Sequence, residues 1–160
     1  MILIALGANL PGPAGAPADA LRAALARLEE RGVKILSVSS FYETPAWPDP
    51  EQPAFVNAVA AVATTLQPVE LLTLLHGVET DFGRLRSAAN APRTLDIDLL
   101  DYDGRVLTHA VMLPHPRMRE RSFVLVPLAQ IAPDWRHPVT GESVLDLLAG
   151  LPDRHVPRAL

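Results

Sequence analysis

The sequence predicts an α+β fold in which a mostly antiparallel sheet is flanked by helices. Three observations lead to this prediction. The chain has 160 residues, 49% of them apolar and 20% charged, as expected of a single globular domain over residues 1–160. Segments with strand and helix patterns follow one another in the order β-α-β-β-α-β. An Asp-Gly pair at 103–104 is typical of the tight turn of a β-hairpin, which joins antiparallel strands.

Helices are expected from the spacing of leucines and from the residues at helix ends. Leucines recur at helical spacing between positions 21 and 28. Pro17 suits the first turn of this helix, Gly32 suits its C-terminal end, and Pro68 opens a second helix in the same way. The expected helices cover residues 17–31, residues 68–83, a segment that begins near Ser122 and a short segment near 143–150.

Strands are expected where apolar residues form short runs or alternate in their direction. The first run is ended by Gly7. In a later run Phe55 and Asn57 point to one face of the sheet, and Val56 and Ala58 to the other. The expected strands cover residues 1–6, 33–44, 54–66, 94–102 and 105–109.

The charge pattern favours a small anionic ligand. The formal net charge is -4, which argues against a nucleic-acid-binding surface because such surfaces neutralise many phosphates. All basic residues except Lys34 are arginines, and six of them cluster in the windows 84–93 and 117–121. The chain has no cysteine, no signal-peptide pattern and no apolar run long enough for a membrane span. A cytoplasmic protein is therefore expected.

A pair of carboxylates interrupts the expected strand at 94–102. Asp96 and Asp98 lie two residues apart, so they project to one face of the strand, roughly 7 Å apart. Such a pair can bind Mg²⁺, which takes one or two protein carboxylates and completes its shell with water and substrate phosphates. Two aspartates on the solvated face of an edge strand are an equally good interpretation of the pattern alone.

Arginines near this pair favour a site for phosphates. Arg84, Arg86 and Arg93 precede the aspartates, and guanidinium groups bind phosphate oxygens through two parallel hydrogen bonds. Carboxylates for a metal beside arginines for phosphates are what phosphoryl transfer requires. Surface ion pairs with acidic residues such as Glu79 are the simpler interpretation of these arginines. His115 and Arg121, in the segment PHPRMRERSF, could likewise bind a phosphate chain or lie in a solvated helical turn.

The few aromatic residues suggest a site for a flat ring. Phe55 and Asn57 share one strand face, and Phe123 lies beside the second arginine cluster. A heteroaromatic ring could stack between the two phenylalanines while the amide binds its polar edge. Packing in the core is the more usual role of a phenylalanine. The chain has neither a P-loop motif nor a dinucleotide-binding glycine motif.

Together these segments resemble the 6-hydroxymethyl-7,8-dihydropterin pyrophosphokinase family over nearly the whole chain. The matching segments are ALGANL (5–10), SSFYETPAW (39–47), QPAFVNA (52–58), ETDFGRLR (79–86), APRTLDIDLL (91–100), LPHPRMRERSFVLVPLAQIAP (113–133) and HPVTG (137–141). The resemblance implies a ferredoxin-like α+β sandwich. It also implies an enzyme of folate biosynthesis that transfers pyrophosphate from ATP to the pterin hydroxymethyl group, releases AMP and uses two magnesium ions.

The family's functional residues carry over onto this chain by position. The resemblance implies that Asp96 and Asp98 are the metal ligands and act in catalysis with Arg84 and Arg93. It implies that the ATP-binding residues are Leu72, Glu79, Arg84, Arg86, Arg93, Leu99, His115 and Arg121. It implies that the pterin-binding residues are Gly7, Thr44, Pro45, Trp47, Phe55, Asn57, Asp96 and Phe123. No general base is assigned.

The expected partners are the small molecules ATP and 6-hydroxymethyl-7,8-dihydropterin, without nucleic acid or membrane, and a monomer is expected. Two other functions stay open at this stage. One is a magnesium-dependent phosphotransferase with a different small acceptor on the same fold. The other is a non-catalytic module that binds a ligand or RNA, against which the net charge of -4 and the aspartate pair both count.

Overall fold

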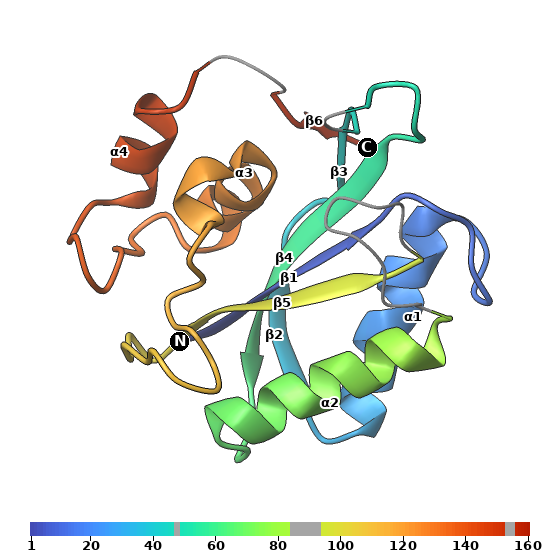
Figure 1. The fold of residues 1–160 in the computed structure, drawn as a ribbon, viewed down its shortest axis with the longest axis horizontal. Coiled ribbons are helices and arrows are strands. Elements are labelled where there is room, and N and C mark those ends of the chain that lie inside the picture. Colours follow the sequence, from blue (N-terminus) through green and yellow to red (C-terminus); the bar gives the residue numbers. More distant parts are fainter. Residues whose placement is uncertain (47–48, 84–93, 153–155) are drawn as a thin grey trace.

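A computed structural model describes residues 1–46, 49–83, 94–152 and 156–160, and shows one sheet with helices on both faces (Figure 1). The strands are β1 (Ile2–Ala8), β2 (Lys34–Val38), β3 (Tyr42–Thr44), β4 (Phe55–Ala63), β5 (Asp96–Tyr102) and β6 (Arg158–Ala159). Their order in the sheet is β5-β1-β4-β3-β6, and β2 also pairs with β4. All pairings between the described strands are antiparallel, which confirms the predicted α+β class.

The helices divide between the two faces of the sheet. They are α1 (Pro17–Glu30), α2 (Pro68–Asp81), the 3₁₀ turn η1 (Met118–Glu120), α3 (Ser122–Ile131) and α4 (Val144–Ala149). Helices α1 and α2 cover one face, and α3 and α4 lie on the other (Figure 1). Pro17 and Pro68 stand in the first turns of α1 and α2, as predicted. No helix within the described ranges is both long and apolar enough to cross a bilayer.

Alternation along the central strands creates two cores, one on each face of the sheet. On β1, Ile4 and Leu6 pack toward α1 and α2, whereas Leu3 packs toward α3 and α4. On β5, Ile97 belongs to the first core and Leu100 to the second. The sheet face that α3 and α4 cover is apolar at one end and polar at the other, because Asp96 and Asp98 occupy the beginning of β5 on that face. One end of this face is therefore core, and the other end is a polar pocket.

The strand predicted at 33–44 is in fact two strands, separated at residues 39–41. The hydroxyl of Ser39 accepts a hydrogen bond from the backbone N–H of Val59, 3.0 Å away. The next N–H, of Ser40, donates to the side-chain oxygen of Gln130 on α3 instead of to a strand. The Ser39 N–H still donates to the carbonyl of Val59, so the ladder stops only at Ser40, before the chain pairs again as β3.

The prediction of a strand at residues 105–109 is wrong, although the turn before this segment forms. Asp103 and Gly104 adopt positive φ angles of 53° and 72°, as a tight turn requires. Beyond the turn the chain does not pair with β5, and only Leu107 forms an isolated bridge, to Leu113. The short strand β6, which pairs with β3, had no signal in the sequence pattern.

Candidate active site

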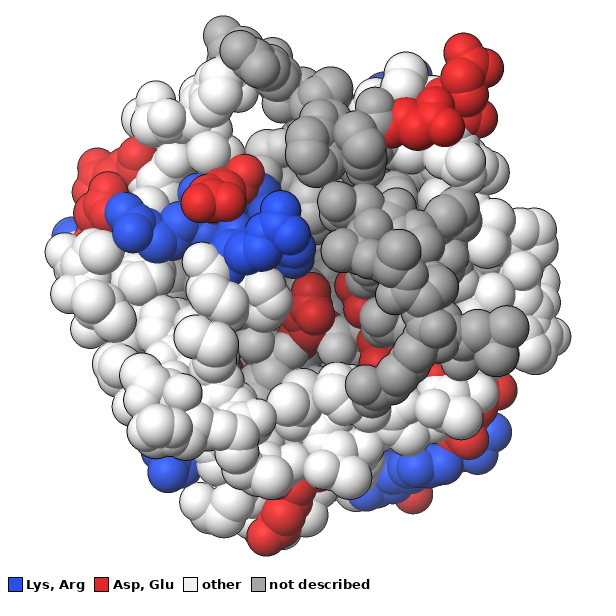
Figure 2. Space-filling model, in the orientation of Figure 1, with Lys and Arg blue, Asp and Glu red and all other residues white. Residues whose placement is uncertain are grey.

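A pocket of about 340 Å³ lies on the α3 side of the sheet, where β5, β1 and β4 meet the segment from η1 to the start of α3. Figure 2 shows acidic side chains at the bottom of this hollow and basic side chains on its rim. The acidic residues of the wall are Asp96, Asp98 and Glu120, and the basic ones are Arg117 and Arg121. Its volume falls within the range of small-molecule binding sites.

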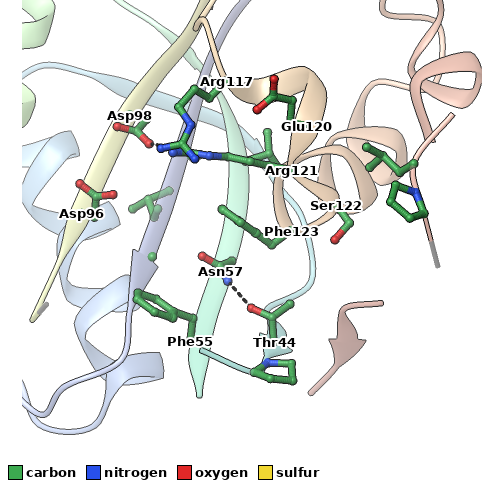
Figure 3. Close-up of a pocket in the computed structure, with 17 residues that line it drawn as sticks. Thr44, Phe55, Asn57, Asp96, Asp98, Arg117, Glu120, Arg121, Ser122 and Phe123 are labelled. Atoms are coloured by element: carbon green, nitrogen blue, oxygen red, sulfur yellow. Dashed lines mark hydrogen bonds and ion pairs between the residues drawn. The ribbon is translucent and has the colours of Figure 1, made fainter. Parts of the chain in front are cut away.

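The two aspartates project from the start of β5 into the pocket, as the alternation predicted (Figure 3). Asp98 Oδ2 is 3.4 Å from Arg121 Nη1, and both side chains are largely shielded from solvent, at 29% and 20% exposure. The ring of His115 also faces this carboxylate, with 3.8 Å between Nε2 and Oδ2. The carboxylate pair therefore lies beside cationic and polar groups.

His115 is held in its neutral form. Burial, and next the positive charge of Arg121, lowers the pKa of His115 from 6.5 to about 4. Its Nδ1 accepts a hydrogen bond from the backbone N–H of Arg117, 3.1 Å away. Nε2 therefore carries the proton and is directed toward Asp98, so that His115 can serve as a neutral hydrogen-bond donor near pH 7.

The other end of the pocket carries the predicted ring-binding residues. Phe55 from β4 and Phe123 from α3 flank Asn57 in the view of Figure 3. The amide Nδ2 of Asn57 donates to Thr44 Oγ1 over 3.1 Å, and this bond is buried. Pro45 completes this part of the wall. Two rings and an oriented amide can bind a flat ligand with a polar edge.

Gly7 leaves room for this amide. It pairs directly with Asn57 in the register between β1 and β4. A Cβ atom at this position would lie 2.6 Å from Asn57 Oδ1, closer than real side chains approach. A side chain at position 7 would therefore have to displace the amide of Asn57.

Nine of the residues predicted from the sequence line this pocket: Gly7, Thr44, Pro45, Phe55, Asn57, Asp96, Asp98, Arg121 and Phe123. His115 is not part of the wall, but its Nε2 lies 3.8 Å from Asp98 Oδ2. Three residues expected to bind the nucleotide are elsewhere: Leu72 is partly buried against the first core, Leu99 belongs to that core, and Glu79 is buried beneath β5. Their contact with ATP stays a prediction. Four predicted residues lie outside the described ranges: Trp47, Arg84, Arg86 and Arg93.

Sequence reasoning missed several residues of the wall. Arg117, Glu120 and Ser122 line the pocket, although none of them was a candidate site residue. The spacing of Arg117, Glu120 and Arg121 over three or four residues contained the signal, because such residues share one side of a helical turn. Leu151 and Pro152, from the segment after α4, also line the pocket, and nothing in the sequence pattern indicated it.

The donor set at the aspartates fits Mg²⁺. Within the described ranges, no group of three or more His, Cys, Asp or Glu side chains could hold a metal ion. Two protein carboxylates are nevertheless what Mg²⁺ takes when water and substrate phosphates supply the remaining ligands. The basic residues beside the pair lie where they can donate hydrogen bonds to those phosphates.

Comparison with known proteins relates the whole chain to one family. The family model described as 7,8-dihydro-6-hydroxymethylpterin-pyrophosphokinase matches residues 3–133. A 2-amino-4-hydroxy-6-hydroxymethyldihydropteridine pyrophosphokinase of Synechocystis sp. is 40% identical over 148 residues, which cover 91% of this chain and 73% of that protein. The protein of the same name from Methylorubrum extorquens is 39% identical over 156 residues, which cover 97% and 96% of the two chains.

Longer relatives contain the same region. The folic acid synthesis protein fol1 of Pneumocystis carinii is 36% identical over 160 residues, which cover 99% of this chain but 21% of that protein. The crystal structure of wild-type Plasmodium falciparum HPPK-DHPS superposes with a TM-score of 0.70 at 15% identity. The match covers 92% of this chain and 40% of the Plasmodium chain, and it shows the shared fold. The family model and the relatives of similar length show that this chain belongs to the 7,8-dihydro-6-hydroxymethylpterin pyrophosphokinase family.

Proposed function

We propose that Asp96 and Asp98 hold two Mg²⁺ ions while the chain carries out the pyrophosphokinase reaction of its family. In this reaction the hydroxymethyl oxygen of the pterin forms a bond to the β-phosphorus of ATP. The bond between that phosphorus and the oxygen that bridges to the α-phosphate breaks, AMP leaves with that oxygen, and the proton of the hydroxymethyl group is released to solvent. The observation that supports the proposal most strongly is that one pocket contains both the aspartate pair and the Phe55, Asn57 and Phe123 group.

The aspartates supply the metal site. When bound, Mg²⁺ would neutralise charge on the triphosphate as the P–O bonds form and break. Asp96 and Asp98 would each contribute carboxylate oxygens from the rigid β5 strand, which fixes their position before substrates arrive. We assign no general base, because the transfer depends mainly on positioning and on charge stabilisation.

Basic and polar side chains bind the phosphate chain. Arg121 is close enough to Asp98 to reach a phosphate held near that carboxylate. His115 would donate one hydrogen bond from Nε2 as a neutral imidazole. Arg84, Arg86 and Arg93 are assigned to the same phosphates by the family resemblance, and Leu72, Glu79 and Leu99 to the nucleotide side of the site.

The pterin ring would stack between Phe55 and Phe123, with its polar edge against the amide of Asn57. The hydrogen bond from Asn57 to Thr44 fixes the plane of that amide. Pro45 and Trp47 are assigned to the same pocket, Trp47 by resemblance alone. This arrangement directs the hydroxymethyl group toward the aspartate end of the pocket, where the phosphates are expected.

The test is a product assay with ATP, Mg²⁺ and 6-hydroxymethyl-7,8-dihydropterin. AMP and the pterin diphosphate should form in equal amounts, and removal of divalent cations with EDTA should stop the reaction. Asp96→Asn is the matched variant, since it keeps the size of the side chain and removes the charge. ADP as the product, or full activity in EDTA, would contradict the proposal. A monomeric, cytoplasmic enzyme remains part of the proposal and is tested by light scattering and by cell fractionation.

A further inference from the structure

Glu79 is a buried carboxylate that the pocket does not use directly. It lies in the last turn of α2, its exposed fraction is 4%, and it is not part of the pocket wall. Its Oε2 accepts a hydrogen bond of 2.8 Å from the backbone N–H of Ile97, and this bond is buried. Ile97 is the residue between the two metal-binding aspartates proposed above.

The position of β5 explains why this hydrogen bond is needed. β5 is the last strand of the sheet and pairs with β1 on one side. The Ile97 N–H donates to Glu79, so it is directed away from β1 and toward α2, which packs beside β5. Without an acceptor, this buried backbone group would lose its hydrogen bond to water and gain none in return.

The same hydrogen bond restrains the segment that carries the aspartates. Ile97 packs its side chain into the core, at 1% exposure, while Asp96 and Asp98 project to the opposite face. The Ile97 peptide groups join the two aspartates, so a shift at Ile97 would change both carboxylates together. The Glu79 oxygen that accepts this hydrogen bond therefore holds this point of the strand in place.

We propose that Glu79 is a positioning residue for the metal site, which acts by binding the Ile97 N–H and so fixing the spacing and direction of Asp96 and Asp98. This inference rests on the proposed function of the two aspartates. It differs from a role of Glu79 as a metal ligand, since no group of three acidic or His side chains forms within the described ranges. It also differs from a role in direct contact with ATP.

Two substitutions separate the hydrogen bond from the charge. Glu79→Gln keeps a side-chain oxygen at the same reach and loses the charge. Glu79→Asp keeps the charge but is one methylene too short to reach Ile97. The readout is the affinity for Mn²⁺ in the presence of α,β-methylene-ATP, measured from the EPR signal of free Mn²⁺, with urea unfolding of each variant in parallel.

We expect Glu79→Gln to bind Mn²⁺ almost as tightly as the unchanged protein, and Glu79→Asp to bind it roughly 10- to 100-fold more weakly, as is usual when a group that orients metal ligands is lost. Asp101→Asn is the matched control. Asp101 is a buried carboxylate of the same strand, but it accepts from Trp135 Nε1 at 2.8 Å and does not contact the pocket. Its replacement should lower the free energy of unfolding and leave Mn²⁺ affinity unchanged.

Normal Mn²⁺ affinity in Glu79→Asp would overturn the inference. So would equal weakening in both Glu79 variants, because the retained hydrogen bond would then have no effect. Weakening in Asp101→Asn to the same degree would show that loss of stability alone explains the result. Failure of the proposed function is distinguishable, since in that case Asp96→Asn, which leaves Glu79 in place, would also bind Mn²⁺ normally.

Discussion

Arg121 and Asp98 form an ion pair at the aspartate end of the pocket, with 3.4 Å between Nη1 and Oδ2. The same guanidinium lies 5.5 Å from the ring centroid of Phe123, within the range of a cation–π contact. Arg121 therefore connects the proposed phosphate region with the proposed pterin region. When a metal ion and a phosphate bind together, the metal ion would bind the Asp98 carboxylate and the phosphate would bind the Arg121 guanidinium.

The first prediction concerns the aspartates. Asp96→Asn and Asp98→Asn should each lower turnover by at least roughly two orders of magnitude, because a fixed charge that stabilises the transition state is lost. Asp98→Asn also removes the ion pair with Arg121 and should cost about 0.5–1 kcal/mol in free energy of unfolding. Steady-state kinetics and urea unfolding measure both effects, and near-normal turnover in either variant would contradict the metal site.

The second prediction concerns the two phenylalanines. Phe55→Ala or Phe123→Ala should weaken pterin binding roughly 5- to 150-fold, because stacking of a ring on an aromatic side chain contributes about 1–3 kcal/mol. The Kd for an ATP analogue should change little in Phe55→Ala, since Phe55 lies at the other end of the pocket from Asp98 (Figure 3). Calorimetric titration with each ligand separates the two effects. Equal losses for both ligands would show that the ring pair does not form a separate pterin site.

The Asp-x-Asp pair illustrates what the sequence could predict. Alternation along a strand depends only on backbone geometry, so the shared face of Asp96 and Asp98 followed directly from their spacing. The same argument placed Phe55 and Asn57 together on β4. That Asn57 reaches Thr44 on one neighbouring strand, and lies opposite Gly7 on the other, depends on which strands are neighbours and in which register. Local pattern does not determine register between distant strands.

Glu79 and Arg117 each make a contact that the sequence pattern could not predict. The resemblance assigns Glu79 to the nucleotide side, and that contact stays a prediction. The hydrogen bond that its carboxylate accepts from the backbone of β5 could not be predicted, because it depends on how α2 packs against the sheet. The segment that contains Arg117 is compatible with a solvated helical turn, because an exposed basic turn has the same pattern as the basic wall of a pocket. Arg117 faces the pocket because η1 brings it above β5, and only the tertiary arrangement determines this.

The third prediction concerns the glycine beneath the Asn57 amide. Gly7→Ala should raise the KM for the pterin on the order of tenfold, because the new Cβ lies 2.6 Å from Asn57 Oδ1 and must displace the amide. The KM for ATP should change much less. Gly77→Ala in α2 is the control, since its Cβ would lie 3.3 Å from Nη1 of Arg31, whose guanidinium pairs with Asp81 and does not line the pocket. It should leave both KM values unchanged. An unchanged pterin KM in Gly7→Ala would contradict this role of the glycine.

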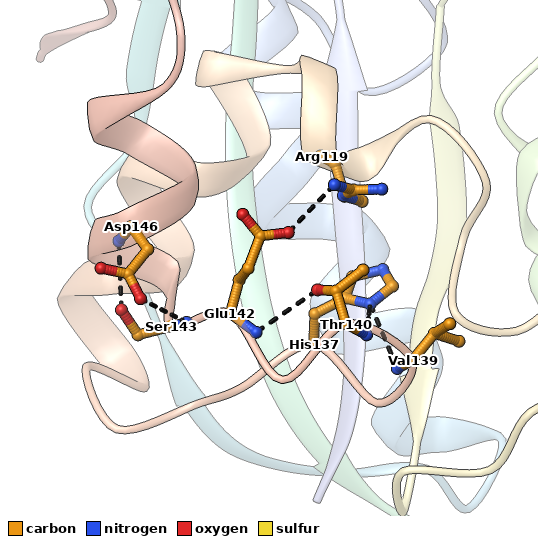
Figure 4. Close-up of polar contacts among 7 residues, drawn as sticks. All are labelled: Arg119, His137, Val139, Thr140, Glu142, Ser143 and Asp146. Carbon is orange, nitrogen blue, oxygen red and sulfur yellow. Dashed lines mark hydrogen bonds and ion pairs between the residues drawn. The ribbon is translucent and has the colours of Figure 1, made fainter.

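The last prediction concerns pH and a histidine remote from the pocket. His137 Nδ1 accepts hydrogen bonds from the backbone N–H groups of Val139 and Thr140, at 3.2 and 3.3 Å (Figure 4). Burial, and next the positive charge of Arg119, lowers the pKa of His137 below 6.5. As pH falls below 6.5, the unfolded chain takes up a proton at this residue before the folded protein does. The contribution of His137 to the free energy of unfolding is therefore complete above pH 6.5 and is lost as pH falls toward its folded pKa.

His137→Asn tests this prediction, because the amide oxygen of asparagine can accept the same two backbone hydrogen bonds but does not titrate. Urea unfolding between pH 7.5 and 5 should give a steeper loss of stability in the unchanged protein than in the variant. Other titrating groups are common to both proteins and cancel in the difference between the two curves. Parallel curves would mean that the turn at residues 137–140 tolerates a protonated imidazole, and that the hydrogen bonds to Nδ1 do not determine its charge state.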